Sequence, residues 1–463
     1  MEQEIKSNMG HCIVIWDITS QCNLRCCHCY NADKYFNNKQ NFEELSTIDA
    51  QNAIDILKYN DIKHIHLLGG EPLIRQDIFY LINYIRSKNI NVSLTTNATL
   101  LTKEICFYLI KYNVNPIFIS LDGVNKETSD FIRGQGTYDL VCKNINLLQN
   151  EIKKHKSAIE IIVSFTVTNR NKSEIPLLPD FCVNLGIDQI NLSCLYEAGN
   201  SCDKKNYLQY EISDIMIELE KMADRLQNMK NPPKIISEFR PRFTLYLNRR
   251  YYKQKSIKYT PVYSRCLAGG PLFYMEANGD LHPCHATNNT KGKQAQKEGY
   301  LKYVKTNILD YINKEIEKSQ YIVSFNMLKK TSNYKQKLKT CKECTVFNDC
   351  DPCPINFYDS FIVPECEWLK QHELQYYKKL LSLVPTINNK SNYVAINSSG
   401  NYVLRMPTEG ISQDIFSQIN SRSSFQQIIK AISIKYSDVP YNTLMRDVCE
   451  YLLDLRCYGV VNF

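Results

Sequence analysis

Three cysteines near the start of the chain have a spacing that could bind a reactive metal cluster. Cys22, Cys26 and Cys29 are separated by three and then two residues. Thiolates spaced in this way can each bind one iron of a cubane [4Fe–4S] cluster and leave the fourth iron without a protein ligand. An iron with an open position can bind and activate a small molecule, whereas a fully ligated cluster only passes electrons. The alternative is a structural zinc site, which would need four ligands, and no fourth ligand lies nearby.

Further residues suited to binding a ligand come later in the chain. In Gly69-Gly70-Glu71 the two glycines let the backbone approach a ligand closely, and the carboxylate can accept hydrogen bonds from an ammonium group. Ser120 and Arg133 follow another apolar segment. For Ser120 and Arg133, ordinary turn chemistry is the alternative interpretation.

The first two hundred residues alternate apolar runs with segments of helical periodicity. This alternation predicts a parallel sheet with right-handed crossovers, hence an α/β fold of the partial (β/α)6 TIM-barrel type. Sites in such barrels form at the carboxyl ends of the strands, and the cysteines and glycines follow strand ends. The six expected strands cover residues 12–18, 64–68, 92–95, 116–121, 159–167 and 189–194.

In kind and order, these residues resemble the motifs of the radical S-adenosylmethionine (SAM) superfamily. The resemblance implies that the open iron chelates SAM, and that one electron splits SAM into methionine and a 5′-deoxyadenosyl radical. It implies that Gly69, Gly70 and Glu71 meet the methionine amine of SAM. Ser120 and Arg133 would contact its ribose or carboxylate, and His28 would lie against the adenine.

A second group of cysteines resembles the SPASM extension of radical-SAM maturases, which holds two auxiliary [4Fe–4S] clusters. The resemblance assigns four cysteines to one cluster and three to the other, whose fourth ligand is missing from the expected segment. Two zinc ribbons are the alternative, but seven thiolates do not divide into two closed four-thiolate sites. The assigned ligands are Cys341, Cys344, Cys350 and Cys366 for one cluster, and Cys266, Cys284 and Cys353 for the other.

His285 follows directly after Cys284. Sulfatase-maturing relatives place an aspartate at the corresponding position, where it is thought to act as a base. Histidine can also accept a proton, so His285 is the candidate acid–base residue.

The last eighty residues show a different pattern. Apolar runs at 393–397 and 402–406 predict two strands, and Ile411–Ile419 predicts a short helix. Ser424 and Gln427 form a capping box that opens a second helix. The apolar face of a third helix carries Leu444, Val448, Leu452 and Leu455.

This winged-helix-like pattern resembles the PqqD-type element that recognises the leader of precursor peptides in pathways to ribosomally made natural products. A DNA-binding winged helix is the alternative. The third helix carries Asp447, Glu450 and Asp454 beside its two arginines, which disfavours phosphate binding.

Composition and motifs together predict three domains. They are the radical SAM partial barrel at 1–262, the SPASM domain at 263–383 and the PqqD-like domain at 384–463. Nineteen clustered cysteines indicate metal ligation in a reducing compartment, and no segment predicts export or membrane insertion, so we expect a cytoplasmic protein.

The three resemblances imply a radical SAM oxidoreductase with SAM and three [4Fe–4S] clusters. It would bind a precursor-peptide leader, take electrons from a donor such as flavodoxin or ferredoxin, and form a thioether or carbon–carbon crosslink in the peptide core. Epimerisation and backbone excision are other outcomes of such families. The alternatives are a maturase of a folded protein of the sulfatase type, a small-molecule SPASM enzyme such as a porphyrin side-chain decarboxylase, and an iron–sulfur sensor that binds DNA.

Overall fold

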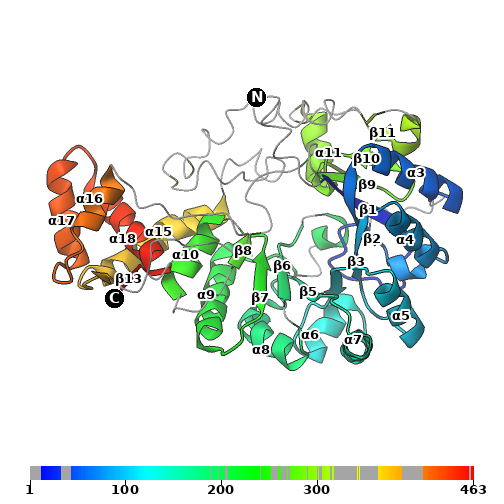
Figure 1. The fold of residues 1–463 in the computed structure, drawn as a ribbon, viewed down its shortest axis with the longest axis horizontal. Coiled ribbons are helices and arrows are strands. Elements are labelled where there is room, and N and C mark those ends of the chain that lie inside the picture. The colour runs from blue at the N-terminus through cyan, green and yellow to red at the C-terminus, as the bar shows by residue number, and fades with distance from the viewer. Residues whose placement is uncertain are drawn as a thin grey trace.

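The fold is built on one long sheet, parallel except at one edge, with helices along its outer face (Figure 1). The computed structural model describes residues 12–32, 43–187, 189–196, 198–203, 207–239, 241–251, 259–261, 268, 272–288, 290–299, 301, 305–312, 315–316, 341, 344, 363–387, 410–457 and 460–463. Of the residues assigned from the sequence, Cys266, Cys350, Cys353 and the two expected strands at 393–397 and 402–406 lie outside these ranges.

The main sheet has the order β11-β10-β9-β1-β2-β3-β4-β5-β6-β7-β8, and all pairs from β9 to β8 are parallel. The six strands expected from the sequence are all present. They are β1 (Cys12–Thr19), β2 (Ile62–Gly69), β3 (Asn91–Thr96), β4 (Ile117–Ser120), β5 (Ile161–Thr166) and β6 (Gln189–Ser193).

Crossover helices join these strands and cover the convex face. Several begin at the caps that their sequences favour, for example Ser46, whose side chain accepts a hydrogen bond from the Asp49 amide. The helices are α3 (Thr47–Tyr59), α4 (Ile78–Ser87), α5 (Lys103–Lys111), α6 (Lys126–Arg133), α7 (Thr137–Lys154), α8 (Leu178–Asn184) and α9 (Ile212–Asn228), with 3-10 turns η1 (Pro72–Ile74), η2 (Lys172–Leu177) and η3 (Gly199–Cys202).

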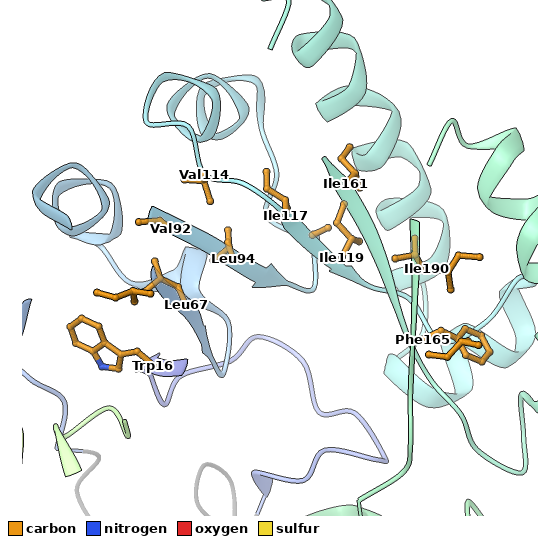
Figure 2. Packing of buried hydrophobic residues seen from close by; sticks show 14 of the residues in the cluster. Trp16, Leu67, Val92, Leu94, Val114, Ile117, Ile119, Ile161, Phe165 and Ile190 are labelled. Atoms are coloured by element: carbon orange, nitrogen blue, oxygen red, sulfur yellow. The ribbon is translucent and has the colours of Figure 1, made fainter. Parts of the chain in front are cut away.

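The two faces of the sheet differ in character. Because side chains alternate along a strand, Leu67, Val92 and Leu94 point into the core between sheet and helices (Figure 2). Their neighbours His66, Ser93 and Thr95 point to the opposite, concave face, where they line a cavity. The buried apolar face stabilises the fold, and the concave face is left for a ligand.

The sheet extends beyond the six strands that the sequence predicted. At one edge it continues with β7 (Lys234–Ser237) and β8 (Tyr259–Pro261). At the other it gains β9 (Leu272–Met275), which pairs in parallel with β1, followed by the antiparallel strands β10 (Asp280–His282) and β11 (Thr306–Asn307). The 3-10 turns η5 (His285–Asn288) and η6 (Ile308–Tyr311) and helix α11 (Thr290–Lys297) flank these strands. The cysteine-rich segment therefore contributes strands to the barrel sheet.

The C-terminal helices form a second core. It contains α16 (Ile411–Ser417), α17 (Phe425–Lys435) and α18 (Tyr441–Cys457), and α17 opens with the expected capping box of Ser424 and Gln427. Helix α15 (Pro364–Leu380) joins the two cores: its Trp368 packs into the barrel core and its Tyr377 into the C-terminal core. A short antiparallel pair, β12 (Thr386–Ile387) with β13 (Val461–Asn462), completes the unit.

A buried ion-pair cluster fixes this unit against α10 (Pro241–Tyr251). Arg249 contacts Glu450 at 2.8 Å and makes two 2.7 Å bonds to Asp454, and Arg456 donates to the Arg249 carbonyl oxygen at 2.6 Å. None of the helices within the described ranges is long and apolar enough to cross a membrane.

Candidate functional site

A cavity of about 800 Å³ occupies the concave face of the sheet, and the motif residues gather at the carboxyl ends of its strands. A volume of this size lies within the usual range for ligand sites. Nine of the ten residues assigned from the sequence to the primary cluster, SAM binding or acid–base chemistry line it: Cys22, Cys26, His28, Cys29, Gly69, Gly70, Ser120, Arg133 and His285. The tenth, Glu71, is not among the lining residues.

Backbone contacts hold the loop that carries the three cysteines. The Cys27 amide donates to the Ile132 carbonyl at 2.9 Å, and Asn200 donates to the carbonyl oxygens of Cys26 and Cys29 at 3.0 Å each. Gly199 lies so close that a Cβ there would be 2.4 Å from the Cys29 oxygen. Helix α6 and the 3-10 turn η3 therefore fix the position of the cysteine loop.

Burial favours the protonated form of the three thiols. It raises the pKa of Cys29 to about 12, with the neighbouring Cys26 adding to the increase, and it also raises the pKa values of Cys22 and Cys26. The positive charge of Arg133, whose Nη1 lies 4.0 Å from the Cys26 sulfur, acts in the opposite direction. Metal binding must therefore displace protons from these thiols.

Three thiols on the wall of one cavity fit the donor set of a cubane cluster, which is bound by cysteine thiolates. Across the part of the chain that the structure describes, no three His, Cys, Asp or Glu side chains are close enough to hold one metal ion.

Asp122 organises the part of the cavity wall that carries His28 and Arg133, and sequence reasoning assigned it no role. Its carboxylate is fully buried, pairs with Arg133 at 2.7 Å and His28 at 3.2 Å, and accepts a bond from the Thr166 amide at 2.7 Å. One carboxylate thus orients two of the residues predicted to contact SAM. Its position directly after β4, within Ser120-Leu-Asp-Gly123, is the signal that could have identified it.

One ring nitrogen of His28 makes no hydrogen bond to any residue that the structure describes. Its Nε2 faces Asp122, and its Nδ1 is buried without a hydrogen-bond partner among those residues. Burial lowers the pKa of His28 to about 4 despite the Asp122 charge, so the ring is neutral near pH 7. A buried nitrogen without a partner is costly unless a ligand satisfies it. This observation fits the expectation that a nucleobase lies against His28.

The Glu71 carboxylate accepts hydrogen bonds from three groups of the protein itself. It accepts bonds from the Leu73 amide at 3.1 Å, the Thr96 hydroxyl at 2.7 Å and the Asn97 amide at 2.7 Å, and its side chain is 1% exposed. Burial raises its pKa to about 7, against the effect of these bonds. Glu71 therefore ties the end of β2 to the end of β3, while the backbone of Gly69 and Gly70 faces the cavity.

His285 lies on the cavity wall beside two aromatic rings. Its ring centroid is 5.1 Å from that of Tyr196, edge to face, and 6.4 Å from that of Tyr30. These rings come from the loops after β6 and β1, so the candidate acid–base residue stands on the same side of the cavity as the cysteines.

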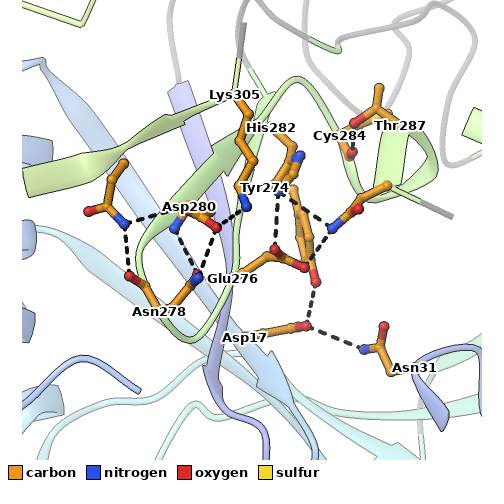
Figure 3. A network of polar contacts seen from close by, with 12 residues as sticks. Asp17, Asn31, Tyr274, Glu276, Asn278, Asp280, His282, Cys284, Thr287 and Lys305 are labelled. Atoms are coloured by element: carbon orange, nitrogen blue, oxygen red, sulfur yellow. Dashed lines mark hydrogen bonds and ion pairs between the residues drawn. The ribbon is translucent and has the colours of Figure 1, made fainter. Parts of the chain in front are cut away.

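Cys284 lies on a hairpin that is anchored to the barrel (Figure 3). Tyr274 of β9 donates a hydrogen bond to Asp17 of β1, and the Asn31 amide donates to the same carboxylate at 3.3 Å. Gly279 takes a φ of +89° in the hairpin turn, a conformation that favours glycine. The Cys284 side chain is buried beside this hairpin, which places a predicted auxiliary ligand close to the barrel edge.

Of the other predicted auxiliary ligands, Cys341, Cys344 and Cys366 are described. The Cys344 amide donates to the Cys341 carbonyl at 3.1 Å, and the Cys344 thiol contacts Arg242. Cys366 and Arg242 both line a cavity of about 190 Å³ beside α18. Cys344 and Cys366 thus share Arg242 as a neighbour.

Comparisons with known proteins agree with this geometry. Residues 16–173 match the Radical SAM superfamily. The mycofactocin maturase MftC of Mycolicibacterium smegmatis is 30% identical over 160 residues, which cover 35% of this chain and 38% of that protein. The chain thus spans less than half the length of that relative. The AdoMet-dependent heme synthase of Methanosarcina barkeri is 26% identical over 347 residues, covering 73% of this chain and 90% of that protein.

The fold is also similar to a solved structure, that of Streptococcus suis SuiB bound to precursor peptide SuiA. The TM-score is 0.56 at 19% identity, and the match covers 78% of this chain and 76% of the other. The cysteine loop, the parallel sheet and the superfamily match agree that residues 16–173 form a radical SAM domain.

Proposed function

We propose that this protein is a radical SAM maturase that binds the leader of a ribosomally made precursor peptide and modifies its core, forming a thioether or carbon–carbon crosslink. The observation that carries the proposal is the single cavity wall that joins the three cysteines to strand residues from β1 to β6. A cluster bound by the cysteines would supply one electron to SAM and so generate the oxidant that removes a substrate hydrogen atom.

Different residues around the cavity would bind the cluster, SAM and the substrate. Cys22, Cys26 and Cys29 would hold the cluster, and the buried His28–Asp122–Arg133 group would orient SAM. The rest of the cavity, towards the amino ends of the strands, carries apolar side chains such as Ile15 and Phe118 together with polar ones such as His64, a mixture that suits a peptide side chain.

The attachment of the C-terminal helices to the barrel supports the proposal that the substrate is a peptide. Their firm attachment through Arg249 would hold a leader-binding surface at a constant distance from the cavity. Binding of the leader would raise the local concentration of the core at the cavity. SuiB, whose solved structure is bound to a precursor peptide, has a similar fold.

The test first looks for a short open reading frame beside the gene and then incubates the encoded peptide with anaerobically reconstituted enzyme, SAM and a strong reductant. We expect a product that has lost two hydrogens, and no product from Cys22→Ala. Deletion of residues 384–463 should abolish peptide modification and keep SAM cleavage. This deletion is combined with Arg249→Met, because removing Glu450 and Asp454 would otherwise leave a buried cation unpaired. SAM cleavage by wild type with an unchanged peptide would refute the assignment of that substrate.

A second candidate is an enzyme that acts on a porphyrin side chain. It is favoured by the alignment with the heme synthase, which covers 90% of that protein. Incubation with an iron porphyrin in place of the peptide separates the two candidates, because the C-terminal deletion should leave porphyrin turnover intact.

A further inference from the structure

Four side chains on β2 and β3 form a continuous hydrogen-bonded row on the cavity wall. His64 Nε2 lies 2.6 Å from Ser93 Oγ, which lies 2.7 Å from His66 Nδ1. The other ring nitrogen of His66 lies 2.9 Å from Thr95 Oγ1. The row connects four side chains through three short hydrogen bonds, and sequence reasoning assigned none of them a role.

The row runs along the cavity, away from the cysteines. All four residues line the cavity, and strand alternation places them on its concave face. Thr95 is nearest to the carboxyl ends of the strands, and His64 lies near their amino ends. The wall around His64 includes Lys63 and Asn91, and both of these side chains reach solvent.

The hydrogen-bond geometry allows the row to exist in two directions. Ser93 has one hydroxyl proton and stands between two imidazole nitrogens, so it donates to one ring and accepts from the other. In one direction Thr95 donates to His66, His66 donates to Ser93, and Ser93 donates to His64. In the other direction all three bonds are reversed. Passage of one proton along the row converts the first arrangement into the second.

We propose that this row is a proton relay that accepts a proton from the substrate in the cavity and releases it to water at the His64 end of the row, beside Lys63 and Asn91. It requires a substrate with an ionisable N–H, O–H or S–H group, and it rests on the proposed function for the identity of that substrate.

The step balances without any electron transfer. The substrate X–H bond breaks, its electron pair stays on X, and the proton binds Thr95 Oγ1 as the threonine proton moves to His66 Nε2. The His66 Nδ1 proton moves to Ser93, and the Ser93 proton moves to His64 Nε2. His64 then loses its other ring proton to water, and the rings and hydroxyls return to the first arrangement by rotation and tautomer exchange.

The surroundings of the His64 and His66 rings disfavour the doubly protonated, charged form of each imidazole. The Phe118 ring on β4 packs edge to face against His66, with centroids 5.3 Å apart. Burial, followed by the charge of His64, lowers the pKa of His66 to about 3, and burial followed by the charge of Arg86 on α4 lowers that of His64. Both rings are therefore neutral near pH 7, and a proton that reaches them is passed on.

The relay also bears on the type of product. A crosslink requires the substrate to lose a proton after a hydrogen atom has been removed, whereas epimerisation requires a hydrogen atom to be returned. A path that takes protons away from the cavity is of use only to the first outcome.

The first experiment measures 5′-deoxyadenosine and modified peptide in the same reaction for wild type, Thr95→Val, Ser93→Ala and Thr95→Ser. The valine variant keeps the shape of the side chain but breaks the row, whereas the serine variant keeps the hydroxyl. We expect modified peptide per 5′-deoxyadenosine to fall at least about tenfold in Thr95→Val and Ser93→Ala and to stay within about twofold in Thr95→Ser. Equal ratios in Thr95→Val and Thr95→Ser, or a parallel loss of both products, would overturn the relay.

A second measurement needs no peptide, so it separates failure of the relay from failure of the proposed function. Nitrogen NMR of the full-length protein labelled in histidine reports the protonation of each ring. We expect neutral His64 and His66 at pH 7, with Ser93→Ala changing both rings and Thr95→Val changing His66 most. A doubly protonated His66, or rings unaffected by Ser93→Ala, would refute the relay. Wild type that cleaves SAM without changing any peptide, but shows the expected ring signals, would refute only the proposed substrate.

Discussion

Replacing Arg249 with methionine should detach the C-terminal helices from the barrel. The Arg249 side chain is 11% exposed, and its guanidinium makes contacts of 2.7–2.8 Å to two carboxylates, Glu450 and Asp454. Methionine keeps most of the apolar stem but leaves both carboxylates without their cation. Removing one partner of a buried pair costs about 3–5 kcal/mol, and the lower end of this range applies because the Asp454 side chain is 39% exposed while that of Glu450 is 6% exposed. Since each 1.4 kcal/mol is a factor of ten, a cost of about 3 kcal/mol should raise the detached population roughly a hundredfold.

Hydrogen exchange with mass spectrometry measures this change directly. Peptides from α18 and the C-terminal half of α15 should lose protection by about that factor, while peptides from β2 to β5 should be unchanged. The matched control replaces all three charges by apolar residues, in the variant Arg249→Met/Glu450→Met/Asp454→Leu, and should recover most of the protection. Unchanged protection in the single variant, or equal loss in the triple variant, would contradict the assignment of this cluster as the main attachment.

Three further predictions concern the cavity. Gly70→Ala should prevent cluster assembly, measured as iron content, because the new Cβ would lie 2.0 Å from the Gln21 carbonyl and 3.0 Å from the Cys22 Cβ; full iron content would contradict this. Glu71 binds more protons in the folded than in the unfolded state between its ordinary pKa of 4.5 and about 7, so the free energy of unfolding should fall by roughly 3 kcal/mol as pH rises through this window. Denaturant unfolding of wild type and Glu71→Gln should show this slope only in wild type. Asp122→Asn should cost about 3–5 kcal/mol in the free energy of unfolding by leaving Arg133 unpaired, and should weaken SAM binding in calorimetry; Ser164→Ala, at a lining hydroxyl on β5, is the control.

The parts of the fold that depend on local patterns were predictable. Each of the six expected strands overlaps an observed one, and Ser424 and Gln427 form the capping box that their spacing indicates. The cysteine loop and the Gly69–Gly70 turn come together because parallel strands end at one edge of the sheet.

Features that depend on distant contacts were not predictable. Strand β9 pairs with β1 across more than 250 residues, and nothing in Leu272–Met275 alone identifies that partner. The three donors to the Glu71 carboxylate come from residues 73, 96 and 97, and the two from the end of β3 are not indicated by the Gly69-Gly70-Glu71 motif; contact of Glu71 with a ligand stays a prediction. The hydrogen-bonded row on β2 and β3 depends on the register between these strands, which places Ser93 between His64 and His66. The roles of the remaining cysteines outside the described ranges stay predictions.

The parallel pairing of β1 with β9 has a consequence for synthesis. Strand β1 ends at Thr19 and its outer neighbour begins at Leu272, so about 250 residues must be translated before that edge can be covered. At a rate of about 5–20 residues per second this takes roughly 10–50 s. During that interval the nascent chain exposes an open strand edge next to the cysteine loop, and open edges invite pairing with other chains. If the cluster is inserted only after β9 has paired with β1, the cysteine loop then follows a strand that is already paired with both β2 and β9.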